Sequence, residues 1–207
     1  DSLLIANPNC STIQLVVVLN QIMKLARFKR VFISTYQAVS GAGAEALGIY
    51  SSQIDGNKHN GPFPKQIFSN VIPQIGDFED NLYCTEEMKL INETRKILEY
   101  PDLAVFPTVV RVPVENGHSE SVTLEFDDEM SYDDSIMSLT DKDGISISKS
   151  YDTPIDVSGS DITRVGRIRI PEWDKRFVQL WIVADNLRKG AATNAVQIAE
   201  ILQSNFF

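Results

Sequence analysis

A cysteine at a predicted helix start is the first residue of this chain that could do covalent chemistry. Cys10 belongs to the motif NPNCST at residues 7–12, and the apolar run IQLVVVL follows at once. Pro8 and Asn9 interrupt the preceding chain, so we predict that Cys10 lies in or beside the first turn of a helix. Unpaired backbone N–H groups and the positive end of the helix dipole meet there, and both favour the thiolate that attacks carbonyl carbon. The alternative is a small buried core cysteine.

Two further groups suited to carbonyl chemistry lie in the second half of the chain. His118 carries an imidazole, which moves protons near neutral pH, and Arg111 offers a planar fork that matches a carboxylate. The link ENGH at 115–118 predicts a hairpin turn between strands at 103–114 and 119–126. We therefore expect antiparallel neighbouring strands, with Arg111 and His118 at the same end of the sheet. By spacing alone, a solvated surface histidine is the alternative.

The elements that must position these residues mix helices with strands. Hydrophobic periodicity and capping signals predict helices at 11–26, 44–54, 85–100, 132–139 and 190–203. Runs rich in β-branched and aromatic residues predict strands at 30–36, 103–114, 119–126, 145–148, 162–170 and 177–183. Residues 64–80 are predicted to be irregular. This order of elements indicates the α+β class, with a mixed, largely antiparallel sheet backed by helices.

Composition limits the kinds of partner and compartment. The chain has 207 residues, of which 43% are apolar, and a net charge of −9, which argues against nucleic acid or an anionic membrane as partner. Two cysteines, Cys10 and Cys84, form no disulfide framework, and neither a membrane-spanning run of about 18 apolar residues nor a signal peptide is evident. We expect the reducing cytoplasm. The acidic stretch at 127–143 lacks the oxygen spacing of a calcium loop, so no metal site is predicted.

Three motifs together closely resemble aspartate-semialdehyde dehydrogenase: NPNCST at 7–12, STYQAVSGAG at 34–43 and RVPVENGHSE at 111–120. The resemblance continues to NLRKGAA at 186–192 and covers nearly the whole chain. By itself the glycine spacing in the second motif does not match a dinucleotide fingerprint. The resemblance implies a fold like the catalytic domain of glyceraldehyde-3-phosphate dehydrogenase, with a sheet that helps build a homodimer.

The resemblance also implies an activity and a set of site residues. The activity is the NADPH-dependent reductive dephosphorylation of L-aspartyl 4-phosphate to L-aspartate 4-semialdehyde through a cysteine thioester, in lysine (diaminopimelate), threonine and methionine biosynthesis. Matched residue by residue, the family assigns nucleophile, base and positioning roles to Cys10, His118 and Gln37. The family assigns Arg111 to the substrate carboxylate and Glu86 to its ammonium group. It assigns Lys89 and Asn9 to phosphate. The NADP contacts are assigned to Ser40, Gly41 and Asn186. By spacing alone, Glu86 and Lys89 form a solvated ion pair.

The same resemblance leads us to expect that catalysis and dinucleotide binding belong to separate domains. The family carries a dinucleotide-binding domain before its cysteine, and none of these 207 residues resembles the glycine-rich loop of such a domain. Residues 1–185 are predicted to form a catalytic and dimerisation domain, inactive in hydride transfer by itself. Residues 186–207 are predicted to form a C-terminal helix that packs on the nucleotide-binding domain and here exposes apolar surface. Two alternatives are a Cys/His hydrolase with Asn116 as orienting residue and a non-catalytic dimerisation module.

Overall fold

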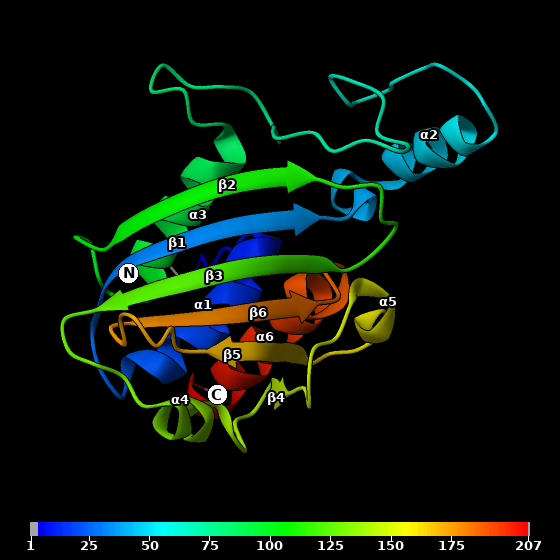
Figure 1. The fold of residues 1–207 in the computed structure, drawn as a ribbon. Coiled ribbons are helices and arrows are strands. Elements are labelled where there is room, and N and C mark those ends of the chain that lie inside the picture. The colour runs from blue at the N-terminus through cyan, green and yellow to red at the C-terminus, as the bar shows by residue number, and fades with distance from the viewer. Residues whose placement is uncertain (1–3, 207) are drawn as a thin grey trace.

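A six-stranded mixed sheet forms the centre of the fold, with its main helices packed on one face (Figure 1). The computed structural model describes residues 4–206. The strands lie in the order β2-β1-β3-β6-β5-β4. Their bounds are β1 (Phe28–Gln37), β2 (Ala104–Arg111), β3 (His118–Phe126), β4 (Ile145–Ile147), β5 (Thr163–Arg169) and β6 (Phe177–Ala184). The β1/β2 and β4/β5 pairs are parallel and the other three pairs are antiparallel, which confirms the predicted fold class.

The five predicted helices agree closely with observed ones, and a further short helix at 154–157 was not predicted. They are α1 (Cys10–Met23), α2 (Ala44–Ile54), α3 (Thr85–Ile97), α4 (Tyr132–Leu139), α5 (Pro154–Val157) and α6 (Thr193–Phe206), with a 3₁₀ turn η1 (Val39–Ala42) and a π-helical turn η2 (Arg188–Ala192). Helix α1 lies centrally against the sheet and contacts β1, β3, β5 and β6. Its Leu15, Leu19 and Ile22 are fully buried, as expected for a helix that is apolar on most sides. This packing fixes the position of Cys10 at its first residue.

The predicted hairpin between the second and third strands is wrong, because β1 lies between β2 and β3 and pairs with both. The connecting residues 112–117 cross the end of β1, where Val39 and Ser40 donate backbone hydrogen bonds to them. Gly117 has a φ of +90°, and a Cβ there would lie 2.9 Å from Pro154 of α5. The expected consequence nevertheless holds, since Arg111 ends β2 and His118 begins β3 at the same end of the sheet.

The sheet face turned toward the viewer in Figure 1 is not covered by the main helices. The exposed aromatic side chains of β1 and β2 lie on this face, opposite the buried ones. Phe32 on β1 stacks on Phe106 of β2 with ring centroids 5.0 Å apart, and Tyr36 contacts Trp181 of β6. Phe32, Tyr36 and Phe106 are 39%, 37% and 45% exposed. We call this surface the open face. An aromatic surface of this kind is typical of a protein interface.

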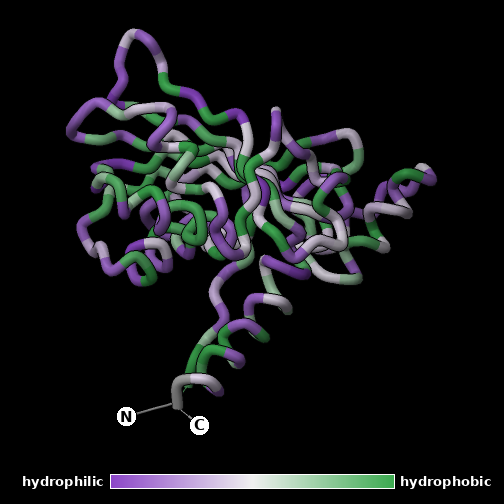
Figure 2. The backbone as a smooth tube through the Cα atoms, turned by 90° about the horizontal axis from the view of Figure 1, so that it is seen from below, coloured by the Kyte–Doolittle hydropathy of each residue, from purple (hydrophilic) through white to green (hydrophobic). Residues whose placement is uncertain are grey.

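Helix α6 projects from the helical side of the protein (Figure 2). Its base is tied to the N-terminal segment, because Asn7 bonds to Ala191 and Asn194. Val196 and Ile201 are more than half exposed, which confirms that this helix presents apolar surface. No helix in residues 4–206 is long and apolar enough to cross a membrane.

Candidate active site

Cys10 is the first residue of α1, as its sequence context predicts. Asn9 is the N-cap, and its side-chain oxygen accepts hydrogen bonds from the backbone N–H groups of Ser11 and Thr12 at 3.0 and 3.3 Å. This is the capping geometry that the NPNCST motif favours. The sulfur therefore lies at the positive end of the helix that is best buried in the fold.

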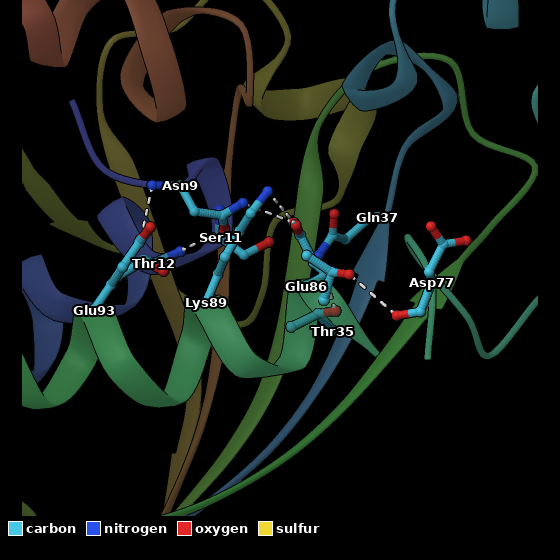
Figure 3. Close-up of polar contacts among 10 residues, drawn as sticks. Asn9, Ser11, Thr12, Thr35, Gln37, Asp77, Glu86, Lys89 and Glu93 are labelled. Carbon is cyan, nitrogen blue, oxygen red and sulfur yellow. Dashed lines mark hydrogen bonds and ion pairs between the residues drawn. The ribbon is translucent and has the colours of Figure 1, made fainter. Parts of the chain in front are cut away.

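Helix α3 brings two carboxylates to the start of α1 (Figure 3). The backbone N–H of Asn9 donates to Glu93 at 2.8 Å, and the Asn9 side-chain amide donates to Glu86 Oε1 at 2.8 Å. Lys89 Nζ lies 3.5 Å from the other oxygen of Glu86. Glu86 and Lys89 therefore lie on one turn of α3, and this turn packs against Asn9, the N-cap of α1. Glu86 is almost fully buried. The interpretation as a solvated surface pair is wrong for Glu86.

The backbone of one buried residue, Ala38, holds both Arg111 and His118. The carbonyl oxygen of Ala38 accepts a hydrogen bond from Arg111 Nη1 at 2.6 Å, and the Ala38 N–H donates to His118 Nδ1 at 3.1 Å. Ala38 follows β1, which runs between the two strands that carry these side chains. The fully buried His118 is therefore no surface residue, and its ring is fixed beside the guanidinium.

Two glycines allow the backbone to approach these side chains closely. A Cβ at Gly41 would lie 2.9 Å from Arg111 Nη1 and 3.1 Å from His118 Nε2. A Cβ at Gly190, in η2, would lie 3.2 Å from the Cβ of Cys10. Gly41 thus closes the site above the imidazole and guanidinium, while Gly190 lets η2 pack directly behind the nucleophile.

A cavity of about 710 Å³ opens beside these groups. Six of the ten predicted site residues line it: Asn9, Cys10, Gly41, Glu86, Lys89 and Arg111. Its other wall comes from the loop before α3, through Pro62–Pro64 and Gln74–Asp77. A thiol, a guanidinium and a carboxylate therefore share one space of small-molecule size. The remaining four predicted residues, Gln37, Ser40, His118 and Asn186, are buried and do not line it.

The four buried residues support the cavity wall. Gln37 lies beside Arg111 in the β1/β2 register and donates to Thr35. The Ser40 hydroxyl and the Asn186 amide bond to each other at 2.9 Å, and Asn186 also accepts from the backbone of Gly117. Ser40 and Asn186 thus hold the turn that carries Gly41. Of the three residues assigned to a nicotinamide, only Gly41 presents its backbone to the cavity.

The surroundings of His118 define its charge and its tautomer. Burial and the neighbouring Arg111 lower the pKa of His118 to about 3, so the imidazole is neutral near pH 7. Because Nδ1 accepts the Ala38 N–H, the ring proton belongs on Nε2. Nε2 has no hydrogen-bond partner among residues 4–206. The ring therefore offers one free N–H donor, whereas a general base would need the other tautomer.

The expected thiolate at Cys10 is not supported in this chain. The Ser11 backbone N–H and Arg111 favour the thiolate, but burial and the carboxylate of Glu86 outweigh them and raise the pKa of Cys10 to about 12. As predicted from the helix start, the local backbone at Ser11 lowers the pKa of Cys10. The prediction did not include the burial and the acidic residue that tertiary packing brings to the sulfur.

We expect slow alkylation of Cys10 in the isolated chain. Because the raised pKa leaves little thiolate, the iodoacetamide rate at Cys10 in the Cys84→Ala variant should rise about tenfold per pH unit from pH 7 to 10, with no plateau near 8.5. The measurement is the mass-spectrometric labelling rate, and the Cys10→Ser variant reports the background. A plateau below pH 9 would contradict the expected pKa.

Sequence reasoning missed several residues that build the site. Ala38 and Gly190 act through the backbone, and nothing in their residue types indicates a role. The carboxylate of Asp185 accepts four hydrogen bonds that organise the loops around it, from Asn116, Gly159, Leu187 and Arg188. Its position beside Asn186 at the end of a strand is the one signal that could have identified it.

Comparisons with known proteins bear on these observations. The family model "Semialdehyde dehydrogenase, dimerisation domain" matches residues 19–189. The aspartate-semialdehyde dehydrogenase of Legionella pneumophila is 47% identical and covers 98% of this chain, which in turn spans 62% of that relative. The crystal structure of aspartate semialdehyde dehydrogenase II from Vibrio cholerae has a TM-score of 0.93 at 43% identity, with 98% of this chain and 63% of that chain covered. A second Vibrio cholerae structure, described as complexed with ASA, has a TM-score of 0.92 at 42% identity over 98% of this chain and 63% of that one.

The fold and the site define a class of protein: an α+β domain that presents a helix-start cysteine to a polar cavity. Within that class, the chain belongs to the semialdehyde dehydrogenase dimerisation-domain family. It spans less than two thirds of the length of the curated relatives described above.

Proposed function

We propose that this chain is the catalytic and dimerisation domain of an aspartate-semialdehyde dehydrogenase. The observation that carries the proposal is the single cavity in which the Cys10 thiol, the Arg111 guanidinium and the Glu86 carboxylate meet beside the buried His118. These groups match a nucleophile and partners for the two charged ends of an amino-acid aldehyde. The relatives named above support the substrate class.

The proposed chemistry proceeds on Cys10. The sulfur adds to the aldehyde carbon and the thiol proton reaches the carbonyl oxygen, which gives a thiohemiacetal. Loss of hydride from carbon and of the hydroxyl proton leaves a thioester, and attack by phosphate releases aspartyl phosphate and the free thiol. The biosynthetic direction reverses these steps. When bound, NADP accepts the hydride or NADPH supplies it.

His118 acts in this scheme through its Nε2–H. Charge develops on the carbonyl oxygen when sulfur or hydride adds to carbon, and a fixed N–H donor in a buried site stabilises that charge. The Ala38 hydrogen bond to Nδ1 supports this donor role, because it keeps the ring proton on Nε2. We propose oxygen stabilisation as the main role of His118, in place of removal of the thiol proton.

The other charged residues would hold the substrate. Arg111 binds the carboxylate through the part of its guanidinium that Ala38 leaves free, and Glu86 binds the ammonium. Lys89, half exposed in the cavity, and Asn9 bind phosphate. Gln37 supports the position of Arg111 from the neighbouring strand.

Dinucleotide binding needs more than this chain provides. The backbone at Gly41 fits the approach of a nicotinamide to Cys10, with Ser40 and Asn186 holding the turn. We propose that a separate dinucleotide-binding domain holds NADP, that it packs on the exposed apolar side of α6 in segment 186–207, and that residues 1–185 form the catalytic and dimerisation domain. The isolated chain is then inactive. With both cysteines free, the reducing cytoplasm suits the reaction.

We propose that the open face forms a homodimer, in agreement with the family description. Phe106→Glu places a charge among the stacked rings and should weaken self-association at least about a hundredfold. Analytical ultracentrifugation measures the dissociation constant. Met137→Glu changes an exposed apolar residue on α4 and should leave it unchanged. An unchanged dimer in Phe106→Glu, with wild-type folding, would reject the open face as the interface.

The decisive experiment mixes or co-expresses this chain with the dinucleotide-binding domain of a relative. Phosphate-dependent reduction of NADP by aspartate semialdehyde is then followed at varied domain ratios. We expect turnover only with both domains, phosphate and aldehyde present. Two folded, associated domains without turnover would refute the dehydrogenase proposal and favour the non-catalytic dimerisation module.

The hydrolase alternative lacks its orienting residue. A Cys/His hydrolase needs a third group to direct the imidazole, and Asn116 was the candidate. The side chain of Asn116 instead contacts Ser40, Ser158 and Asp185, while the Ala38 backbone orients His118. Thioester hydrolysis by the isolated chain, lost in Cys10→Ser, would restore this alternative.

A further inference from the structure

Glu87 is a buried carboxyl side chain on α3 that the proposed reaction does not use. Each of its two oxygens accepts a hydrogen bond from a backbone N–H group. Oε2 accepts from Cys84, at the start of the same helix, at 2.9 Å. Oε1 accepts from Val109 on β2, 22 residues further along the chain, at 3.2 Å. Glu87 therefore links the first turn of α3 directly to the backbone of β2.

The strand that Glu87 holds is the terminal strand of the sheet. β2 pairs with β1 on one side, and its other edge is covered near the cavity by contacts from outside the sheet. Ile72 exchanges backbone hydrogen bonds of 2.9 and 2.8 Å with Arg111, and Glu87 binds the N–H of Val109, two residues earlier on the same edge. A buried N–H without a partner is costly, so these contacts fix the end of β2.

The link from Glu87 acts on two side chains of the cavity. Glu86 precedes it on α3, and Arg111 follows Val109 by two residues on β2. Both line the cavity. The hydrogen bond from Asn9 ties Glu86 to α1 (Figure 3), but it does not set the separation of Glu86 from Arg111. That separation depends on how α3 lies against β2, which the bond from Val109 to Glu87 fixes at the cavity end of both elements.

This separation matters for an amino-acid ligand because its carboxylate and ammonium groups are attached to the same carbon. Arg111 and Glu86 can bind both groups at once only if the strand and the helix keep one fixed spacing. A ligand that has the carboxylate alone makes no such demand, since Arg111 can hold it wherever α3 lies.

We propose that Glu87 is a positioning residue that makes the cavity selective for an amino-acid aldehyde over the same aldehyde without an ammonium group. The inference rests on the proposed function only in assigning Arg111 and Glu86 to the two charged groups of the substrate. Loss of the link lets α3 shift against β2. A ligand held by Arg111 then no longer meets Glu86, while binding of the carboxylate by itself is unchanged.

The far end of α3 provides a matched control. Arg95 Nε donates to the carbonyl oxygen of Leu103, just before β2, at 2.7 Å. This bond also joins a side chain of α3 to backbone next to β2, but neither residue lines the cavity. Arg95→Met therefore removes a link of the same kind at a place where it cannot act on the ligand directly.

The test measures binding to the isolated chain by calorimetry at pH 7. The two probes are aspartate semialdehyde and succinate semialdehyde, which differ only in the ammonium group. The wild type should prefer aspartate semialdehyde at least about tenfold, because a buried carboxylate binds the ammonium. Glu87→Leu should reduce this preference to within about threefold and leave the dissociation constant of succinate semialdehyde within about twofold. Arg95→Met should keep the wild-type preference.

Three results would overturn the positioning role. They are a folded Glu87→Leu with the wild-type preference, equal weakening of both probes in Glu87→Leu, and loss of the preference in Arg95→Met as well. If Glu87→Leu does not fold, Glu87→Gln decides, because its single carbonyl oxygen satisfies one N–H and its amide group meets the other. Its preference should fall at least about threefold, and an unchanged preference would refute the role.

Failure of this inference can be told apart from failure of the proposed function. A wild type without the preference would refute the assignment of Glu86 to the ammonium, and the inference with it. A wild-type preference that survives in Glu87→Leu would refute the inference alone. Both results are obtained without cofactor or turnover, so the outcome of the dehydrogenase assay does not alter them.

Discussion

Cys10→Ser should abolish turnover of the complex reconstituted with a dinucleotide-binding domain, lowering kcat by more than about a thousandfold. Serine fits the first position of α1 and keeps the Asn9 cap, so the fold is preserved. The hydroxyl, however, is a far weaker nucleophile near neutral pH and has no activating base, because His118 carries its proton on Nε2. The steady-state rate of NADP reduction and the loss of an acyl-enzyme burst measure the effect.

Cys84→Ser provides a matched control. Cys84 is the N-cap of α3 and does not line the cavity, and serine is a preferred N-cap residue. Its activity should stay within about twofold of the wild type. Residual turnover of Cys10→Ser above one tenth of the wild-type rate would remove Cys10 from the proposed mechanism.

Arg111→Lys should raise the KM for the aldehyde by about 10- to 100-fold, with a smaller effect on kcat. Lysine keeps the charge but loses the planar fork that here bonds to the Ala38 carbonyl and presents donors to a carboxylate. The ammonium would also be poorly placed to hold the Ala38 carbonyl, and Ala38 is the residue whose N–H orients His118. Initial rates against aldehyde concentration in the reconstituted complex measure both constants.

Arg176→Lys controls for the change of cation itself. Arg176 pairs with Asp174 in the exposed link between β5 and β6, away from the cavity lining, and its replacement should leave KM unchanged. If Arg111→Lys binds aldehyde as well as the wild type, the substrate carboxylate is held elsewhere.

Local signals in the sequence were sufficient to predict most elements. Helices α2 and α4 have the predicted bounds, and β1 differs by two residues at one end and one at the other. Turn chemistry and periodicity act over a few residues, so the sequence around each element carries its own start and stop. The fold class follows from their order.

Strand pairing was beyond these signals. The Asn116-Gly117 pair correctly indicated a reversal between two strands, but the reversal spans β1 and is no tight hairpin. The residues of the turn do not indicate that β1 lies between β2 and β3, because strand order depends on contacts between residues far apart in the chain. Arg111 and His118 still lie close together, because the reversal of the chain places the end of β2 and the start of β3 at the same end of the sheet.

The sequence was sufficient to predict several of the side chains that line the cavity, but not their protonation states. Cys10, Arg111 and Glu86 share the cavity as the resemblance implied. The raised pKa of Cys10 depends on burial and on Glu86, and the tautomer of His118 depends on the Ala38 N–H; only the folded chain defines these contacts.

The contact between Gly190 and Cys10 has a mechanical consequence. Gly190 belongs to η2, which runs directly into α6, so the backbone packed behind the nucleophile continues into the projecting helix. A Cβ placed at Gly190 would lie 3.2 Å from the Cys10 Cβ, so the two backbones approach closely enough for a shift of η2 to reach Cys10. A partner that binds α6 and shifts it would therefore also shift the position of the Cys10 sulfur.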